Sequence, residues 1–297
     1  MIDYESLWNK SKLFIGKAIN RRDEGDFSEF QLWASLSLEL LGKAALTYKH
    51  PSLIVDPNTP NGFLVAINES QSVDFKTITA KTVFERLQNL VNVSRFDADT
   101  KKFCMTLANH RNEELHSGAL PFVGMNMDHW LPKFWDVCKM LLEFQNKSLS
   151  DLLGPREARA AEEIIQARSV SLKALIEARI QRHRTEVRQK YEGPVPRDML
   201  KVIPVLTDDD QETISCPSCG GHAVIYGEIL DEGPEYIDKE EPWITYQDNQ
   251  YEITSLKCRV CDLKLNSLDE VTAAGIDHTF EKTITIEPDY EPDYGND

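Results

Sequence analysis

The hydrophobic positions in the first half of the chain recur with the spacing of amphipathic helices. Between 127 and 147 the apolar residues are spaced alternately by four and three, which places them on one face of a helix. They are Trp130, Phe134, Val137, Leu141 and Phe144. The same kind of spacing predicts four earlier helices, over about 4–21, 28–48, 81–93 and 100–117. Amphipathic helices joined by moderate loops are typical of a bundle, so we expect residues 1–150 to form one.

Capping residues and prolines indicate where some of these helices begin and end. Ser28 followed by Gln31 predicts a capping box at the start of the second helix. Gly118 occupies the position of a C-terminal cap after the fourth helix. The stretch 51–77 is rich in proline, asparagine and serine, and we expect it to be a long connection without regular structure.

After residue 211 the pattern changes to the alternation of apolar and polar residues that is typical of strands. The segments with this pattern are 223–226, 251–254 and 283–286. We therefore expect a mainly α protein in which a small β-rich domain, 212–286, follows the helices after a linker at 193–211. Residues 287–297 carry the tetrapeptide Glu-Pro-Asp-Tyr twice, and this acidic tail is predicted to be disordered.

The net charge of −16 is distributed unevenly along the chain. Residues 212–297 contain 20 acidic and 5 basic residues and carry a charge of −15, whereas residues 1–211 carry −1. The N-terminal part can therefore bind a polyanion such as RNA. The C-terminal part is expected to repel nucleic acid and to suit a basic, regulatory protein partner.

Neither a membrane span nor a secretion signal is predicted. No apolar run approaches the roughly 18 residues that a transmembrane helix needs. The N-terminus, Met1 to Glu5, is acidic and lacks the apolar stretch of a signal peptide. We expect a soluble cytoplasmic protein with no membrane partner.

The six cysteines form two groups. Cys104 and Cys138 lie alone within helical patterns, where a thiol packs as a small hydrophobic group. The others form two Cys-x-x-Cys pairs separated by 38 residues. These pairs consist of Cys216, Cys219, Cys258 and Cys261.

Two Cys-x-x-Cys pairs are the usual ligand set of a structural zinc site. A gap of two residues lets both thiolates of a pair bind one ion, and two pairs complete a tetrahedral shell with no open position. We therefore expect one structural Zn²⁺ per chain; a pair of cytosolic disulfides is the alternative. The segment 212–286 resembles a zinc ribbon with a long insert, and this resemblance implies a metal site but no particular function.

A long, highly charged helix is predicted over about 155–191, within the segment 151–192 that joins the bundle to the linker. Pro155 suits its first turn. Its C-terminal half is basic, and such a helix can lie along phosphates, so we predict four substrate-binding arginines. They are Arg179, Arg182, Arg184 and Arg188. The alternative is a solvated helix, or one paired with an acidic partner such as the β-rich domain.

The fourth predicted helix ends in a cluster of polar residues that can carry chemistry. At 100° per residue, Asn109, Asn112 and His116 fall within about 60° of one another. Arg111 lies about 140° from His116, so the two diverge on a straight helix and converge more easily across a two-fold axis. Histidine exchanges protons near neutral pH, and arginine offers a fork of donors to a phosphate. The helix therefore contains a group suited to proton transfer and a group suited to phosphate binding.

The segment from Arg111 to His116 resembles the motif of the HEPN (higher eukaryotes and prokaryotes nucleotide-binding) family. Ribonucleases of this family are helical bundles that carry an arginine, four to six residues, then a histidine, with a polar residue such as Asn112 after the arginine. The helix containing Glu39 resembles the family's second helix, and Glu39 corresponds to its acidic residue. The resemblance covers roughly 1–147.

The resemblance implies a metal-independent endoribonuclease that acts as a homodimer. His116 would transfer protons, Arg111 would stabilise the phosphate, and Asn112 would orient His116 or the phosphate. Glu39 would position Arg111 or fix the tautomer of His116. The products would carry 2′,3′-cyclic phosphate ends, and the usual setting is a toxin or antiphage defence system. The alternatives are an Arg111 that pairs with Glu114 on the surface, and a non-catalytic dimeric scaffold that binds a partner.

Overall fold

The computed structural model divides into two compact units, Met1–Arg168 and Ser169–Asp297. It describes residues 3–59, 64, 76–90, 96–125, 127–237 and 244–286. The first unit is helical and the second contains an antiparallel sheet, so the expected mainly α fold with a small β part is confirmed. No helix in the described ranges combines the length and apolar character that crossing a membrane requires.

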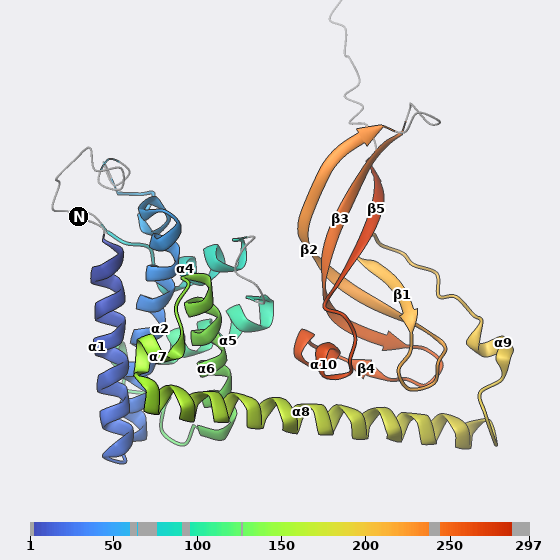
Figure 1. Ribbon diagram of the computed structural model, residues 1–297, viewed down its shortest axis with the longest axis horizontal. Helices are drawn as coiled ribbons and strands as arrows, with labels where there is room; N and C mark the ends of the chain where they lie inside the picture. The colour runs from blue at the N-terminus through green and yellow to red at the C-terminus, as the bar shows by residue number, and fades with distance from the viewer. Residues whose placement is uncertain are drawn as a thin grey trace, which may run out of the picture. The chain divides into compact units, whose positions relative to one another are not determined.

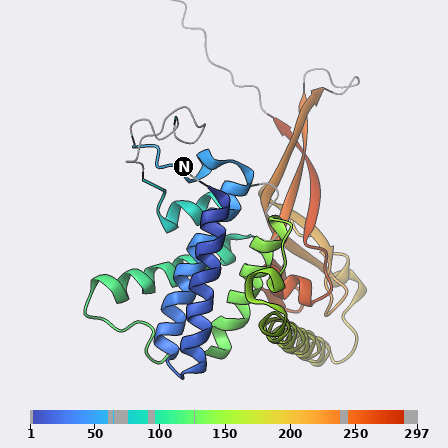
Figure 2. The ribbon, with the colours of Figure 1, turned by 60° about the vertical axis from the view of Figure 1, so that its left-hand side comes forward.

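The helical unit is built around a hairpin of two long helices. α1 (Tyr4–Asp23) and α2 (Phe27–Lys49) lie side by side in both views (Figure 1 and Figure 2). Gly25, with a φ of 85°, permits the tight turn between them. The two helices pack closely where their side chains are small. There the hydroxyl groups of Ser11 and Ser37 each donate a hydrogen bond to the carbonyl oxygen of the other residue, at 3.1 and 2.9 Å.

The remaining helices of this unit enclose one hydrophobic core with the hairpin. The predicted buried face of α6 is confirmed, since Trp130, Phe134, Val137 and Leu141 are at most 3% exposed. Cys104 and Cys138 are also buried in this core, as predicted. The elements are η1 (Pro51–Ile54), α4 (Ala80–Gln88), α5 (Ala98–His116), α6 (Met127–Phe144), α7 (Leu149–Leu153) and the first turns of α8 (Pro155–Lys190).

The capping box predicted at Ser28 is wrong. Asp26 is the N-cap of α2, and its carboxylate accepts a hydrogen bond from the Glu29 amide at 3.0 Å. Because an aspartate caps the helix two residues earlier, Ser28 lies inside the helix. Gln31 is only 1% exposed and belongs to the interior of the unit.

The C-terminal ends of three helices also differ from the predictions. Ser117 caps α5 with an extended backbone (φ −130°), so Gly118 does not form a left-handed cap. α4 ends at Gln88, earlier than expected, and residues 91–95 lie outside the described ranges. α6 ends before residue 147 because the chain turns at Asn146, which has a φ of 54°.

The two ends of the stretch 51–77, which was predicted to be a connection, pair with each other. η1 is followed by an isolated bridge between Val55 and Thr77. The Ile78 amide donates to the Ile54 carbonyl at 3.0 Å. Residues 60–63 and 65–75 lie outside the described ranges, but the pairing fixes the segment that leads into α4.

The second unit is built on an antiparallel sheet of order β1-β2-β3-β4, with β5 also paired to β3. The predicted strand segments lie within β2, β3 and β5, and these strands continue beyond the apolar stretches because backbone pairing extends into polar sequence. The elements are α9 (Arg197–Leu200), β1 (Gln211–Ser215), β2 (His222–Ile237), β3 (Thr245–Cys258), β4 (Lys264–Leu265), α10 (Leu268–Ala273) and β5 (Thr279–Ile286).

The long helix predicted at 155–191 is confirmed as α8, which has 36 residues. Ala158 and Ala161 of its first turns belong to the core of the helical unit. Its later residues Ile176, Ile180 and Val187 belong to the core of the second unit. The boundary between the two units therefore falls inside this helix. The predicted linker 193–211 contains α9, and the acidic tail 287–297 lies outside the described residues.

Gly42 allows close approach of α2 and α4, and we predict that Gly42→Leu destabilises the helical unit. A Cβ at this position would lie 2.8 Å from Val83 Cγ1 and 3.2 Å from Leu87 Cδ1. Overpacking of this kind costs about 1–3 kcal/mol of unfolding free energy. Urea unfolding followed by circular dichroism measures the loss. Gly16→Ala is the control, because no atom lies within 4 Å of its added Cβ; equal midpoints for the two variants would contradict the prediction.

Candidate active-site cleft and metal centre

A cleft of about 520 Å³ in the helical unit brings together the four predicted catalytic residues. Arg111, Asn112 and His116 reach it from α5, and Glu39 reaches it from α2. The divergence expected between Arg111 and His116 on a straight helix does not separate them, because both side chains line the same space. Thr79, Ala80 and Lys81, at the start of α4, form a further part of its wall.

A buried charge network holds Arg111 in this cleft. Arg111 Nη1 donates a hydrogen bond to Glu39 Oε2, while Lys43 Nζ lies 2.8 Å from Glu39 Oε1. The side chains of Arg111 and Glu39 are 11% and 15% exposed. Lys43 Nζ also donates to Thr77 Oγ1 at 3.1 Å. Glu39 thus occupies the position expected of a residue that orients Arg111.

The electrostatics of this network keep Glu39 ionised. Burial raises the pKa of Glu39, but the positive charges of Lys43 and Arg111 lower it by more, and the pKa lies below the usual value for a glutamate. A charged arginine and lysine are tolerated in a buried position only with such a partner. Arg111 therefore differs from an ordinary surface arginine, and Glu39 is its partner.

The other polar residues that line the cleft from α5 are accessible to solvent. Asn109, Asn112 and His116 are exposed, and all three line the cleft. His116 is the last residue of α5, where the helix dipole favours a positive charge. His110 does not line the cleft; its ring packs edge-on against Phe122, with a centroid distance of 5.9 Å. Of these two histidines, His116 is the one that lines the cleft.

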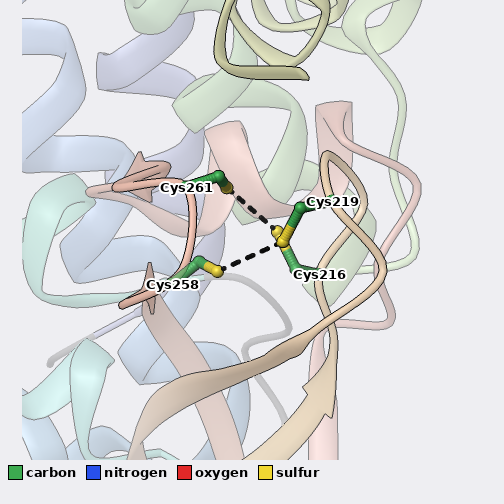
Figure 3. A group of neighbouring side chains, drawn as sticks. All are labelled: Cys216, Cys219, Cys258 and Cys261. Atoms are coloured by element: carbon green, nitrogen blue, oxygen red, sulfur yellow. Dashed lines mark hydrogen bonds between the residues drawn. The ribbon is translucent and has the colours of Figure 1, made fainter. Parts of the chain in front are cut away.

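The four cysteines of the two Cys-x-x-Cys pairs point toward one another in the second unit (Figure 3). Cys216 Sγ lies 3.6 Å from Cys261 Sγ, and Cys219 Sγ lies 3.7 Å from Cys258 Sγ. A disulfide requires about 2.05 Å, and all four thiols are free. Tetrahedral ligands at about 2.3 Å from a zinc ion are separated by about 3.8 Å. The cluster therefore has the dimensions of a metal site.

The local backbone explains why the thiols converge. Gly220 (φ 77°) and Asp262 (φ 60°) each turn the chain directly after the second cysteine of a pair. The Cys216 amide donates to the Gly221 carbonyl at 2.7 Å, and the Cys258 amide donates to the Leu263 carbonyl at 2.9 Å. Each pair thus sits in a closed turn, and Gly220 provides the positive φ that the turn after Cys219 requires.

The thiols also perturb one another. Hydrogen bonding to Cys219, Cys258 and Cys261 raises the pKa of the Cys216 thiol, whereas hydrogen bonding to Cys216 and Cys219 lowers the pKa of Cys258 to about 7. Four thiolates at these distances repel one another unless a cation neutralises them. The donor set therefore fits a thiophilic divalent metal such as zinc, and four protein ligands leave no position for a substrate.

The basic half of α8 binds the turns that carry the cysteines. Arg184 donates to the carbonyl oxygens of Pro217 and Ser218, at 2.8 and 2.9 Å. His183 Nδ1 lies 2.8 Å from the Cys261 carbonyl oxygen. Because these contacts fix carbonyl groups next to the thiols, they orient the cysteines as outer-shell groups do in metal sites.

Two of the four predicted substrate-binding arginines are occupied within the second unit. Arg184 binds the cysteine turn, and Arg179 pairs with Glu270 of α10 at 2.9 Å. Arg182 and Arg188 are exposed and remain candidates for phosphate contact. Arg179 and Arg184 therefore follow the alternative to substrate binding that the sequence left open, because both bind residues of the β-rich domain.

The sequence analysis missed Lys43 and Lys81. Lys43 stands four residues after Glu39, a spacing that indicates an ion pair on a helix and was a usable signal. Lys81 enters the cleft from α4, and no spacing relates it to Arg111. Comparison with known proteins gives no match to a family model, a curated protein or a solved structure. The site is therefore interpreted from its own residues.

We predict that Glu39→Ala destabilises the helical unit by about 3–5 kcal/mol, because Lys43 and Arg111 then lose their buried counter-ion. Adding Arg111→Ala to Glu39→Ala is expected to restore part of the loss. Since the folded-state pKa of Glu39 is depressed, its contribution is full above the unfolded value, about 4.3, and is lost as the pH falls further.

Chemical unfolding between pH 3 and pH 7 measures both effects. The difference in unfolding free energy between wild type and Glu39→Gln should shrink below about pH 4. Glu113→Gln is the matched control, because Glu113 is exposed on α5. A pH-independent difference for Glu39→Gln would contradict an ionised, buried Glu39.

Proposed function

We propose that the protein is a metal-independent endoribonuclease of the HEPN type. The carrying observation is the cleft in which Arg111, Asn112 and His116 meet Glu39. An arginine held by a buried carboxylate is preorganised, and preorganised charge is the main source of transition-state stabilisation in such sites. The resemblance of the Arg111 to His116 segment to the HEPN motif supports the same reaction.

The proposed reaction is a phosphoryl transfer within the RNA strand. The 2′-hydroxyl loses its proton and its oxygen bonds to the adjacent phosphorus, while the bond from phosphorus to the 5′-oxygen breaks. His116 exchanges the protons, and Arg111 stabilises the negative charge on the phosphate. The leaving oxygen takes up a proton, so the products are a 2′,3′-cyclic phosphate and a 5′-hydroxyl.

We propose that the active form is a homodimer. A base and an acid are both needed, and two copies of His116 near a two-fold axis supply them. Large apolar side chains flank the motif and support an interface there: Leu115, Leu120 and Val123 are 51%, 65% and 62% exposed. In this proposal the enzyme acts on cytoplasmic RNA as a toxin or an antiviral defence effector, a setting that rests on the HEPN resemblance.

For the cysteine cluster we propose one structural Zn²⁺ per chain, in a unit of the zinc-ribbon type. The support is the four-thiol donor set with the separations of tetrahedral ligands. The ion would neutralise the thiolates and hold together the two turns on which α8 packs. It takes no part in the proposed cleavage, which uses residues of the helical unit.

A scaffold or interaction protein is the second candidate function. The observation that favours it is the outer half of β2, which combines exposed apolar residues with acidic ones. Ile229 and Ile237 are 53% and 60% exposed. The acidic residues of this stretch are Glu228, Asp231, Glu232 and Glu235. Such a surface suits a basic protein partner, which in the enzyme hypothesis would regulate the nuclease.

We predict that the purified wild type cleaves RNA with chelator present and that His116→Ala does not. The variant should lose at least about 100-fold in rate, because general acid–base catalysis contributes that much or more. Total RNA and transfer RNA are the substrates, and end analysis should find 2′,3′-cyclic phosphates. His278→Ala, at an exposed position of the second unit, is the control and should retain activity.

Equal cleavage by wild type and His116→Ala would mean that a contaminant or another site cuts the RNA. Absence of cleavage by the wild type would favour the scaffold. In that case His116→Ala should bind the same cellular proteins as the wild type.

We predict one zinc per chain by mass spectrometry after purification without chelator. Cys258→Ser should reduce this ratio well below one, because the tetrahedral set is then incomplete. Cys138→Ala, in the core of the helical unit, should keep its zinc. Metal should be released as the pH falls, since protons compete for the thiolates. A metal-free wild type, or equal loss in both variants, would rule out the site.

A further inference from the structure

The start of α4 forms a second charged wall of the cleft. Thr79 is the N-cap, and its hydroxyl oxygen accepts a hydrogen bond from the Thr82 amide at 3.4 Å. The first amides of a helix have no partner within it, and the helix N-terminus carries a partial positive charge. Ala80 and Lys81, the first two residues of α4, line the same space as the motif residues. The first turn of α4 and the residue Lys81 therefore border the cleft.

Lys81 is available to bind an anion. Its side chain is 69% exposed, and it approaches Glu85 at 3.7 Å, a pair in which both groups remain in contact with solvent. Exposed pairs of this kind contribute little to stability and exchange readily for another partner. The guanidinium of Arg111 binds Glu39 through Nη1, and its buried Nε has no hydrogen-bond partner among the described residues.

The position of α4 relative to Arg111 is fixed by buried contacts. Glu39 binds Arg111 and Lys43, and Lys43 binds Thr77, two residues before the N-cap of α4. Gly42 allows α4 to pack closely on α2. These contacts hold the start of α4 in place relative to Arg111, while the Lys81 side chain itself remains exposed.

We infer that the cleft binds two successive phosphates of a single RNA strand. The scissile phosphate lies at Arg111 and His116, and the neighbouring phosphate lies at Lys81 and the first amides of α4. The inference rests on the proposed function, which supplies the RNA substrate. The volume of about 520 Å³ falls within the roughly 300–1,000 Å³ of pockets that hold a whole small ligand, and so leaves room beyond one phosphate.

The second subsite makes Lys81 a positioning residue for the substrate strand. A neighbouring phosphate held at α4 fixes the direction of the strand, and hence which 2′-hydroxyl faces His116. Lys81 does not touch the reacting atoms. Its loss is therefore expected to raise KM while kcat remains unchanged.

Binding of a non-cleavable strand tests the subsite without relying on catalysis. The probe is a fluorescein-labelled 2′-O-methyl oligouridine, titrated with full-length protein at several salt concentrations. Lys81→Ala should bind on the order of ten-fold more weakly at low salt, and the slope of log K against log salt should fall in magnitude by about 0.7, as for one lost phosphate contact. Lys102→Ala, exposed on α5 and outside the cleft, should bind as the wild type does.

Unchanged affinity and slope in Lys81→Ala, an equal loss in Lys102→Ala, or no binding by the wild type would each overturn the inference. Cleavage kinetics then separate it from the proposed function. A wild type that cleaves, with the same KM in Lys81→Ala, keeps the nuclease and removes the subsite. Binding that depends on Lys81, with no cleavage by the wild type, keeps the subsite and removes the nuclease.

Discussion

The arrangement of the charged groups in the helical unit depends on the ion pairs that the buried carboxylate of Glu39 forms. Two cations, Lys43 and Arg111, share it, and both would be costly to bury alone. Lys43 extends the network to Thr77 and so to the segment before α4. Three parts of the chain that are remote in sequence therefore meet at one negative charge. The cleft lies beside this charge network, and the network sets the distance between the cleft walls on α2, α4 and α5.

The second unit shows the same principle with different chemistry. Four thiols take the place of the carboxylate, and the turns that carry them are bound from outside by His183 and Arg184 of α8. The basic half of α8 thus binds carbonyl groups of the cysteine turns and, through Arg179, the carboxylate of Glu270. Positive charge along a helix indicates phosphate binding only where the guanidinium groups are still accessible. Arg188 is exposed, and Arg182 is exposed beside Glu186, with 3.8 Å between Arg182 Nε and Glu186 Oε1.

The two units divide the proposed activity between them. In the proposed function, the cleft of the helical unit supplies the groups for proton transfer and phosphate binding, while the acidic strand β2 of the other unit would repel RNA and suit a basic protein. A nuclease with its catalytic groups and its partner surface in different units could be regulated without changes in its catalytic residues. Cys216, Cys258 and Cys261 belong to the hydrophobic core of the β-rich unit.

The sequence by itself determined the features that depend on local spacing. It predicted α1, α2, α4, α5, α6 and α8, because apolar periodicity is a property of neighbouring residues, but not the short helices α7, α9 and α10. It also predicted the two cysteine pairs, because two ligands with two residues between them can bind one ion. Arg111 and His116 were predicted as site residues from their side-chain chemistry and their spacing, and Glu39 from the family resemblance. Only the tertiary structure decided that Arg111 pairs with Glu39, that Lys81 enters the cleft and that Arg179 and Arg184 bind their own unit. These contacts join residues far apart in the chain, so their choice depends on the packing of whole elements, which no local pattern records.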